Sequence, residues 1–127
     1  MLESVGYEYA CYLDIALRLL PGLQVREARV IGGGARSALW NRIKADILGV
    51  PYVTLDREEF ATLGSAVLAG YAVGVFPDLR VAVQHMVHEV DRIEPDPERH
   101  TRYRQFVQHY RRLLDVTRPL FDALAAT

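Results

Sequence analysis

The sequence has little that would mark it for secretion, for a membrane or for thiolate metal binding. Cys11 is its only cysteine, which excludes an internal disulfide framework and a metal site built from several thiolates. No apolar run approaches the roughly 18 residues that a membrane-spanning helix needs. The first residues include Glu3 and Glu8, where a signal peptide would have a basic start. We therefore expect a cytoplasmic protein in a reducing compartment.

An excess of charge of either sign is also missing. The chain has 15 Lys and Arg against 16 Asp and Glu, so its formal net charge is −1. Nucleic-acid and anionic-membrane binders usually show a basic surface, and this balance predicts neither partner. The length of 127 residues and the apolar fraction of 50% suit a single domain with a real core.

Apolar periodicity predicts an alternation of helices and short strands. The expected strands are Ala28–Ile31 and Tyr52–Leu55, and residues 87–93 fit either class. In the last helix, Pro119 is expected to break or kink the chain. The expected helices cover residues 2–20, the stretch from an N-cap at Ser37 to Gly49, residues 61–73, about 77–86, and the region after 97.

The order strand, helix, strand predicts one βαβ unit in an α/β fold. Its two strands should be parallel, with a right-handed crossover, and flanked by helices. Two parallel strands make a poor sheet, because parallel sheets are normally larger and buried on both faces. We therefore expect the chain to be part of something larger.

The stretch VIGGGARSALW, residues 30–40, places three glycines between a strand and a helix. Such a loop can offer free amides and a positive helix end to an anion, or it can be only a tight turn. A dinucleotide-binding pattern would fall on Gly32, Gly34 and Ser37 with Asp56 as the ribose acid, but its third glycine is missing. A Walker loop is excluded, since no Gly-Lys-Ser/Thr follows.

Several ordered motifs carry a resemblance to a known family. The chain resembles the C-terminal region of the FGGY carbohydrate kinases, most of all the xylulokinase-like members. The resemblance extends over nearly the whole chain and ends in a proline-flanked acidic turn and a Tyr-rich helix. The matching positions are Gly32-Gly33-Gly34-Ala35-Arg36-Ser37, Trp40, Ala45-Asp46, Glu59 and Gly64-Ser65-Ala66.

The resemblance implies that residues 1–127 are the C-terminal segment of a nucleotide-binding domain with an actin-like, ribonuclease-H-like ATPase fold. It implies ATP as cofactor, ATP or ADP as ligand, and a sugar substrate, most simply a xylulose-like pentulose. The glycine loop, Gly32 to Gly34, would lie against the nucleotide. Backbone amides of Gly33, Gly34 and Ala35 would then contact the ribose or α-phosphate, and Asn41 would reach the adenine side.

In this family the catalytic Asp, the phosphate-binding hairpins and most of the sugar site precede the region seen here. We therefore expect the N-terminal sugar-binding domain to be absent from these 127 residues and Mg²⁺ to be held mainly by that missing part. No catalytic residue and no metal ligand is assigned here. The alternative is a stand-alone, non-catalytic fragment, or a module that complements a split kinase. A homo-oligomer or pairing with the missing half is also open.

The remaining polar residues favour structural interpretations. His85 and His88 lie one turn apart and are expected to face solvent, because a metal site would need further ligands. The arginines of the last helix are expected to form a solvated face. Asp56, Glu58 and Glu59 suit the N-terminal turn of a helix, and Asp46 is expected at most to support a site from behind.

Overall fold

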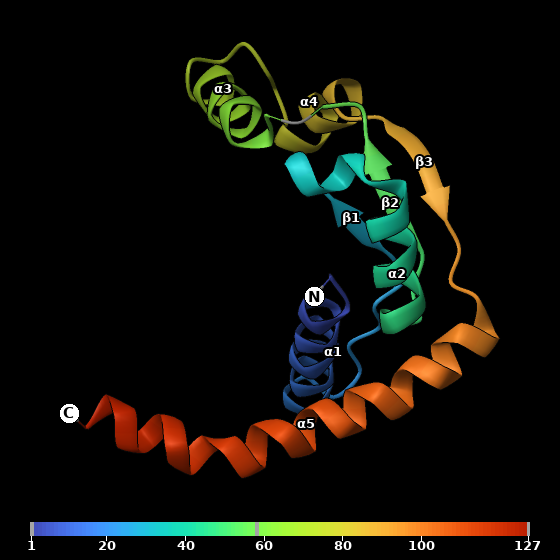
Figure 1. Ribbon diagram of the computed structural model, residues 1–127. Helices are drawn as coiled ribbons and strands as arrows, with labels where there is room; N and C mark the ends of the chain where they lie inside the picture. Colours follow the sequence, from blue (N-terminus) through green and yellow to red (C-terminus); the bar gives the residue numbers. More distant parts are fainter. Residues whose placement is uncertain (1, 58, 127) are drawn as a thin grey trace.

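The computed structural model describes residues 2–57 and 59–126, and Figure 1 shows how their helices and strands are arranged. Two helices and the sheet form a body, the last helix runs along its side, and two helices project from the end of the sheet. In chain order the elements are α1 (Leu2–Leu19), β1 (Ala28–Val30), the 3₁₀ turn η1 (Gly33–Arg36), α2 (Ala38–Leu48), β2 (Tyr52–Leu55), α3 (Phe60–Ala72), α4 (Leu79–Met86), β3 (Glu89–Ile93) and α5 (Pro97–Ala125).

The sheet has the order β1-β2-β3. β1 and β2 are parallel, with Ala28 opposite Tyr52, as the sequence predicts. β3 pairs with β2 in the antiparallel sense, with Ile93 opposite Tyr52, so the sheet is mixed and not purely parallel. The local sequence could not decide between helix and strand for this segment, because its side chains show no buried pattern. Only Ile93, at the end of the strand, is buried, whereas Val90 is 67% exposed.

Local capping explains where the helices begin and end. The Ser37 hydroxyl accepts a hydrogen bond from the Trp40 amide at 3.2 Å, which confirms the predicted N-cap of α2. Gly49 ends the same helix in the left-handed region, with φ 69°. Asp96 caps α5 by accepting from the Arg99 amide, and Pro97 occupies its first turn.

The last helix is not broken at Pro119. α5 continues to Ala125 as a curved rod that extends beyond the body of the molecule (Figure 1). Proline removes one hydrogen bond, to the carbonyl of Asp115, and its ring crowds that carbonyl. Both residues lie on an exposed part of the helix, where water can solvate the released carbonyl.

Two small clusters form the core. In the first, Ala10, Ile47 and Val107 meet where α1, α2 and α5 pack together. In the second, Ala45 on α2 covers Tyr52 and Ile93 of the sheet. α2 therefore belongs to both clusters and joins the helical side of the molecule to the sheet.

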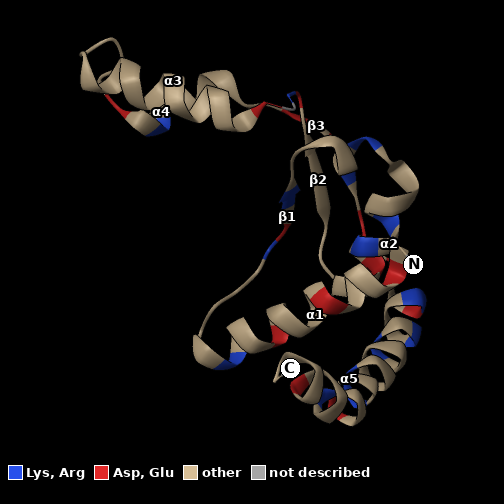
Figure 2. Ribbon diagram, turned by 60° about the vertical axis from the view of Figure 1, so that its left-hand side comes forward, with Lys and Arg blue, Asp and Glu red and all other residues tan. Residues whose placement is uncertain are grey.

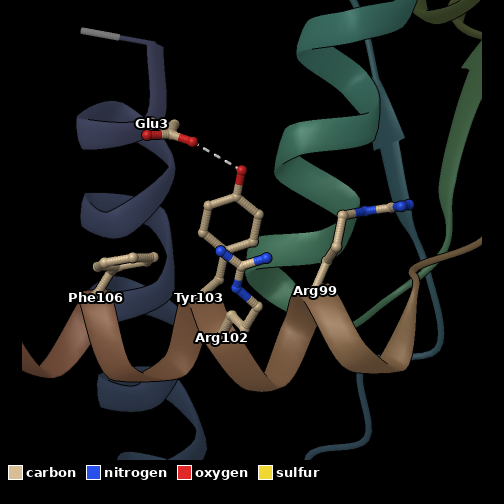
Figure 3. Close-up of a pocket in the computed structure, with 5 residues that line it drawn as sticks. All are labelled: Glu3, Arg99, Arg102, Tyr103 and Phe106. Carbon is tan, nitrogen blue, oxygen red and sulfur yellow. Dashed lines mark hydrogen bonds between the residues drawn. The ribbon is translucent and has the colours of Figure 1, made fainter.

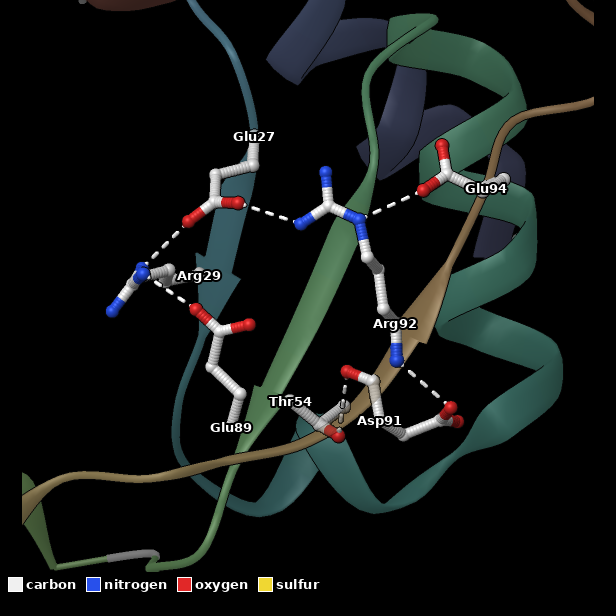
Figure 4. A network of polar contacts seen from close by, with 7 residues as sticks. All are labelled: Glu27, Arg29, Thr54, Glu89, Asp91, Arg92 and Glu94. Carbon is white, nitrogen blue, oxygen red and sulfur yellow. Dashed lines mark hydrogen bonds and ion pairs between the residues drawn. The ribbon is translucent and has the colours of Figure 1, made fainter.

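The other face of the sheet is covered by charged side chains (Figure 4). Arg29, Val53 and Arg92 are in register across the three strands and so share this face. Glu27 accepts from both arginines, at 2.8 Å from Arg29 and 2.7 Å from Arg92. Glu89 completes the cover with a 2.6 Å ion pair to Arg29, and Val53 beneath is fully buried.

The chain exposes more surface than its mass predicts. A compact 14.4 kDa monomer would expose roughly 6,800 Å², whereas this chain exposes 9167 Å². One reason is the α3–α4 pair, which projects from the sheet. Figure 2 shows α3 without a single charged residue. Another is α1, which has an outward apolar face that includes Val5, Tyr9 and Tyr12.

Candidate functional site

A cavity of about 260 Å³ lies at the carboxyl ends of β1 and β2, beside the first turn of α2. In open α/β sheets this edge is where ligands usually bind. Three of the five residues predicted to bind nucleotide, Gly32, Ala35 and Asn41, line it. The other lining residues are Arg36, Ala38, Thr54, Leu55, Arg57, Asp91 and Ile93.

The glycine loop turns immediately after β1 and then forms η1. Gly32 has φ 79° and ψ 179°, a backbone conformation that favours glycine. The Ala35 amide donates to the Gly32 carbonyl at 3.0 Å. In this conformation the turn itself uses the Ala35 amide hydrogen, and the predicted contact of Ala35 with a nucleotide stays a prediction. The amides of Gly33 and Gly34 open the turn and have no acceptor within it.

The space beside the middle of the loop is open. A Cβ atom added to Gly33 would meet no atom of the described residues within 4 Å. At Gly34 the nearest atoms are Cδ1 and Nε1 of Trp40, at 3.9 Å, which is ordinary contact. Packing among the described residues thus gives no reason for glycine at these two positions. Close approach of another molecule or segment is the remaining use of a glycine with ordinary φ.

The side chain of Asn41, on the first turns of α2, is hydrogen-bonded to the glycine loop. Its side chain is 1% exposed, and its Nδ2 donates to the Ala35 carbonyl at 2.7 Å. Its Oδ1 is buried and has no hydrogen-bond partner among the described residues. A buried acceptor of this kind usually meets a water or a ligand donor. The residue predicted to reach adenine therefore also fixes the conformation of the turn.

Asp56 follows the lining residue Leu55 and precedes the lining residue Arg57, and it forms a close pair with His88. The His88 ring nitrogen Nδ1 lies 3.0 Å from Asp56 Oδ2, and the His88 amide donates to Asp56 Oδ1 at 3.2 Å. The side-chain hydrogen bond from His88, followed by the backbone one, lowers the pKa of Asp56. His85 and His88 do not act together, because His88 lies outside α4 and faces Asp56. Glu58 lies outside the described residues.

Lys44 on α2 is a buried charged residue that sequence reasoning missed. It is 6% exposed, and its ammonium lies 4.8 Å from the Trp40 ring centre and 5.0 Å from that of Tyr52. Burial lowers the pKa of Lys44 and raises that of Tyr52 to about 12. One sequence signal was available: the only lysine follows the only tryptophan by four residues, which places both on one helix face.

A smaller cavity, of about 160 Å³, lies between the starts of α1 and α5 (Figure 3). It is lined by Glu3, Arg99, Arg102, Tyr103 and Phe106. The Tyr103 hydroxyl donates to Glu3 at 2.8 Å and closes one side. Two charged groups of this cavity already have partners, because Glu3 accepts from Tyr103 and Arg99 pairs with Asp46.

The arginines of α5 are only partly a solvated face. Arg104 and Arg111 both pair with Asp14 of α1. Arg99 pairs with the buried Asp46 of α2 at 2.6 Å. Three arginines thus fasten α5 to the body, where the sequence predicted only solvent contact.

The described residues contain no group of three or more His, Cys, Asp or Glu side chains placed to hold a metal ion. None of the described helices is long and apolar enough to cross a membrane.

Comparison with known proteins gives one family. A model of the C-terminal domain of the FGGY family of carbohydrate kinases matches residues 1–73. The chain is 31% identical over 115 residues to a xylulose kinase of Staphylococcus epidermidis, covering 91% of the chain and 23% of that protein. It is 42% identical over 94 residues to a glycerol kinase of Koribacter versatilis, covering 74% of the chain and 18% of that protein.

Solved structures agree with these relatives. The xylulose kinase of Rhodospirillum rubrum superposes with a TM-score of 0.76 at 28% identity, covering 95% of the chain and 24% of that protein. A ligand-bound xylulose kinase of Lactobacillus acidophilus has a TM-score of 0.78 at 22% identity, which shows likeness of fold, and covers 91% and 23%. The predicted α/β fold, the C-terminal part of an actin-like, ribonuclease-H-like ATPase fold, is confirmed. The chain spans about a quarter of these proteins.

Proposed function

The chain belongs to the FGGY family of carbohydrate kinases, and from this premise we propose that residues 1–127 supply one wall of an adenine-nucleotide site in a sugar kinase. The intact enzyme would transfer the γ-phosphoryl group of ATP to a sugar hydroxyl. The observation that carries the proposal is that Gly32, Ala35 and Asn41 line a cavity at the edge of the sheet, with open space beside the intervening Gly33. The amides of Gly33 and Gly34 have no acceptor in their own turn, and these two residues lie in the loop between Gly32 and Ala35, which line the cavity.

The chemistry of the cavity suits a nucleotide better than a neutral sugar. The amides of Gly33 and Gly34 stand at the start of a turn, where free N–H groups favour an anion. Two arginines, Arg36 and Arg57, and one acid, Asp91, line this cavity, and Arg57 also lies 3.7 Å from Asp56. Asn41 Oδ1 is an acceptor without a partner among the described residues, and the exocyclic amine of adenine is a donor. These residues would hold and orient the nucleotide without taking part in bond making.

The reacting groups are proposed to lie elsewhere in the enzyme. Phosphoryl transfer needs Mg²⁺, a base for the sugar hydroxyl and groups that position both substrates. We assign none of these roles to residues 1–127, and Mg²⁺ would be held by the rest of the kinase. The similarity to xylulose kinases makes a xylulose-like pentulose the favoured substrate. A cytoplasmic location is part of the proposal, and the free thiol of Cys11 suits it.

A direct test uses the only tryptophan of the chain. A Cβ added to Gly34 would lie 3.9 Å from the Trp40 indole, so the fluorescence of Trp40 should report a nucleotide at the loop. We expect a saturable change with ADP or ATP at millimolar concentration and none with NAD. A response to NAD alone would favour the dinucleotide alternative. The absence of any response, together with unchanged thermal unfolding in ADP, would contradict nucleotide binding at this cavity.

A further inference from the structure

Lys44 is a buried cation without a counter-ion among residues 2–57 and 59–126. It is the only lysine among the 15 Lys and Arg residues of the chain, and it is 6% exposed. Its ammonium forms no ion pair or hydrogen bond with any described residue. Charged side chains are almost never buried without a partner, because removing the charge from water is costly. The position of Lys44 therefore needs a physical reason.

The surroundings of the ammonium are aromatic. Trp40, one turn earlier on α2, lies 4.8 Å away, and Tyr52 on β2 lies 5.0 Å away. Tyr9 on α1 is a further titratable group on this side, since it acts electrostatically on Tyr52. The faces of aromatic rings attract a cation, most strongly that of tryptophan. The ammonium thus joins a helix to a strand through two ring faces.

One of these two rings, that of Trp40, lies beside the glycine loop. The indole of Trp40 lies beside Gly34, close enough that an added Cβ there would be 3.9 Å from it. The next residue, Asn41, holds the Ala35 carbonyl. Trp40 thus lies beside Gly34, Asn41 is hydrogen-bonded to Ala35, and the Lys44 ammonium contacts the first of these two residues of α2.

We propose that Lys44 is a positioning residue, whose charge holds Trp40 against β2 and thereby keeps the amides of Gly33 and Gly34 in the orientation that a ligand meets. This inference rests on the proposed function for the identity of the ligand, but not for the effect on the loop. An apolar side chain of equal length would fill the same space at lower desolvation cost. Only the charge attracts both ring faces at once.

The test compares Lys44→Met, which keeps the length and removes the charge, with Lys44→Arg, which keeps a cation. We expect Lys44→Met to unfold at the same or a higher temperature, because a buried charge is removed. Its amides at Gly33 and Gly34 should nevertheless exchange hydrogen faster, and ADP should bind about tenfold more weakly, the factor that two cation–π contacts would supply. Lys44→Arg should restore slow exchange and the emission of Trp40.

The outcomes are separable. Unchanged exchange at Gly33 and Gly34 in Lys44→Met would overturn the positioning role, whether or not ADP binds. Failure of the natural chain to bind ADP would contradict the proposed function and leave the exchange result as the test of Lys44. A Lys44→Arg chain that exchanges as fast as Lys44→Met would also overturn the role, provided that its circular dichroism spectrum shows a folded protein.

A titration of the natural chain adds a readout that a packing role would not move. Because lysine occurs once, ¹³C-lysine labelling gives a single Cε signal that follows the Lys44 proton directly. The pKa of Lys44 is lowered from 10.5, while Tyr52 keeps its proton to about 12. As Lys44 loses its proton, its contribution to stability should rise, since the folded state disfavours the charge. The emission of Trp40 should change in the same pH range, and in Lys44→Arg it should not; equal pH profiles would overturn the proposal.

Discussion

At the scale of single residues, Asp46 joins two elements that are far apart in the sequence. Its carboxylate is buried and accepts from the Asp96 amide at 2.7 Å and from Arg99 Nε at 2.6 Å. Its backbone carbonyl lies 2.8 Å from the His100 ring nitrogen Nδ1. The end of α2 is thus fixed to the beginning of α5. Sequence reasoning expected no more than support of a site from this residue.

Replacing Asp46 by Ala should destabilise the fold by about 2–3 kcal/mol, the usual worth of hydrogen bonds to a charged group together with a donor left unpaired. The free energy of unfolding in urea measures this change. Asp122→Ala is the matched control, because Asp122 lies exposed near the end of α5, and it should change stability little. A loss as small as that of the control would show that Asp46 does not fasten α5.

Gly33→Ala separates the two interpretations of the loop. The new Cβ would meet nothing among the described residues within 4 Å, so thermal unfolding should not change. If a nucleotide approaches the loop closely, the methyl group should weaken ADP binding by an order of magnitude or more, measured by Trp40 fluorescence. Unchanged affinity with unchanged stability would show that the loop is only a turn.

At the scale of elements, charged side chains take the place of a second helical layer on the outer face of the sheet. Glu27, Arg29, Glu89 and Arg92 cover Val53 there (Figure 4). Hydrogen bonds from Arg92 and Arg29 lower the pKa of Glu27. Exposed ion pairs contribute little singly, and a network contributes more.

The pKa of Glu27 predicts a dependence of stability on acid. A carboxyl group whose pKa is lowered on folding stabilises the protein above its unfolded pKa, and this contribution disappears as pH falls through the folded value. For Glu27 the loss should begin below about pH 4.5, its ordinary value. Glu27→Gln should therefore show a flatter profile of unfolding free energy between pH 5 and pH 3 (roughly the acid range of carboxyl groups). Parallel profiles for the two proteins would contradict this assignment.

At the scale of the whole molecule, apolar surface without a partner is the main feature. The outward side of α1, with Val5, Tyr9 and Tyr12, is exposed, and β1 pairs on one side only with a described strand. Exposed apolar faces and strand edges of this kind mark interaction surfaces or association. The predicted pairing with another part of a kinase, or with a second copy, remains a prediction.

The isolated chain should bind a hydrophobic dye such as ANS and associate as its concentration rises. Tyr12→Ser should reduce both effects without loss of helix content, because Tyr12 is 58% exposed and lies on the outward face. Dye fluorescence and sedimentation velocity measure these two effects. A monomer at all concentrations that binds no dye would show that this face is stable in water.

Without the groups assigned to the rest of the enzyme, we also expect the isolated chain to phosphorylate no sugar. Turnover of any pentulose would contradict that assignment.

The sequence by itself determined what depends on neighbours along the chain. Ser37 as a cap, the end of α2 at Gly49, and the parallel pair around the glycine loop all follow from short-range stereochemistry and apolar periodicity. The family was visible because its motifs are local as well. The nucleotide role of Gly32, Gly33, Gly34, Ala35 and Asn41 stays a prediction.

Only the tertiary structure decided the remaining features. β3 is a strand because β2 offers it a partner, although its own residues are mostly polar. The Ala35 amide is used by its own turn, and Lys44 is buried because Tyr52 lies opposite it. These outcomes could not be read from local sequence. Burial and hydrogen-bond partners depend on residues that folding brings close together. A polar or charged side chain has no desolvation cost in water, whereas its burial in the interior raises the free energy unless it finds a partner.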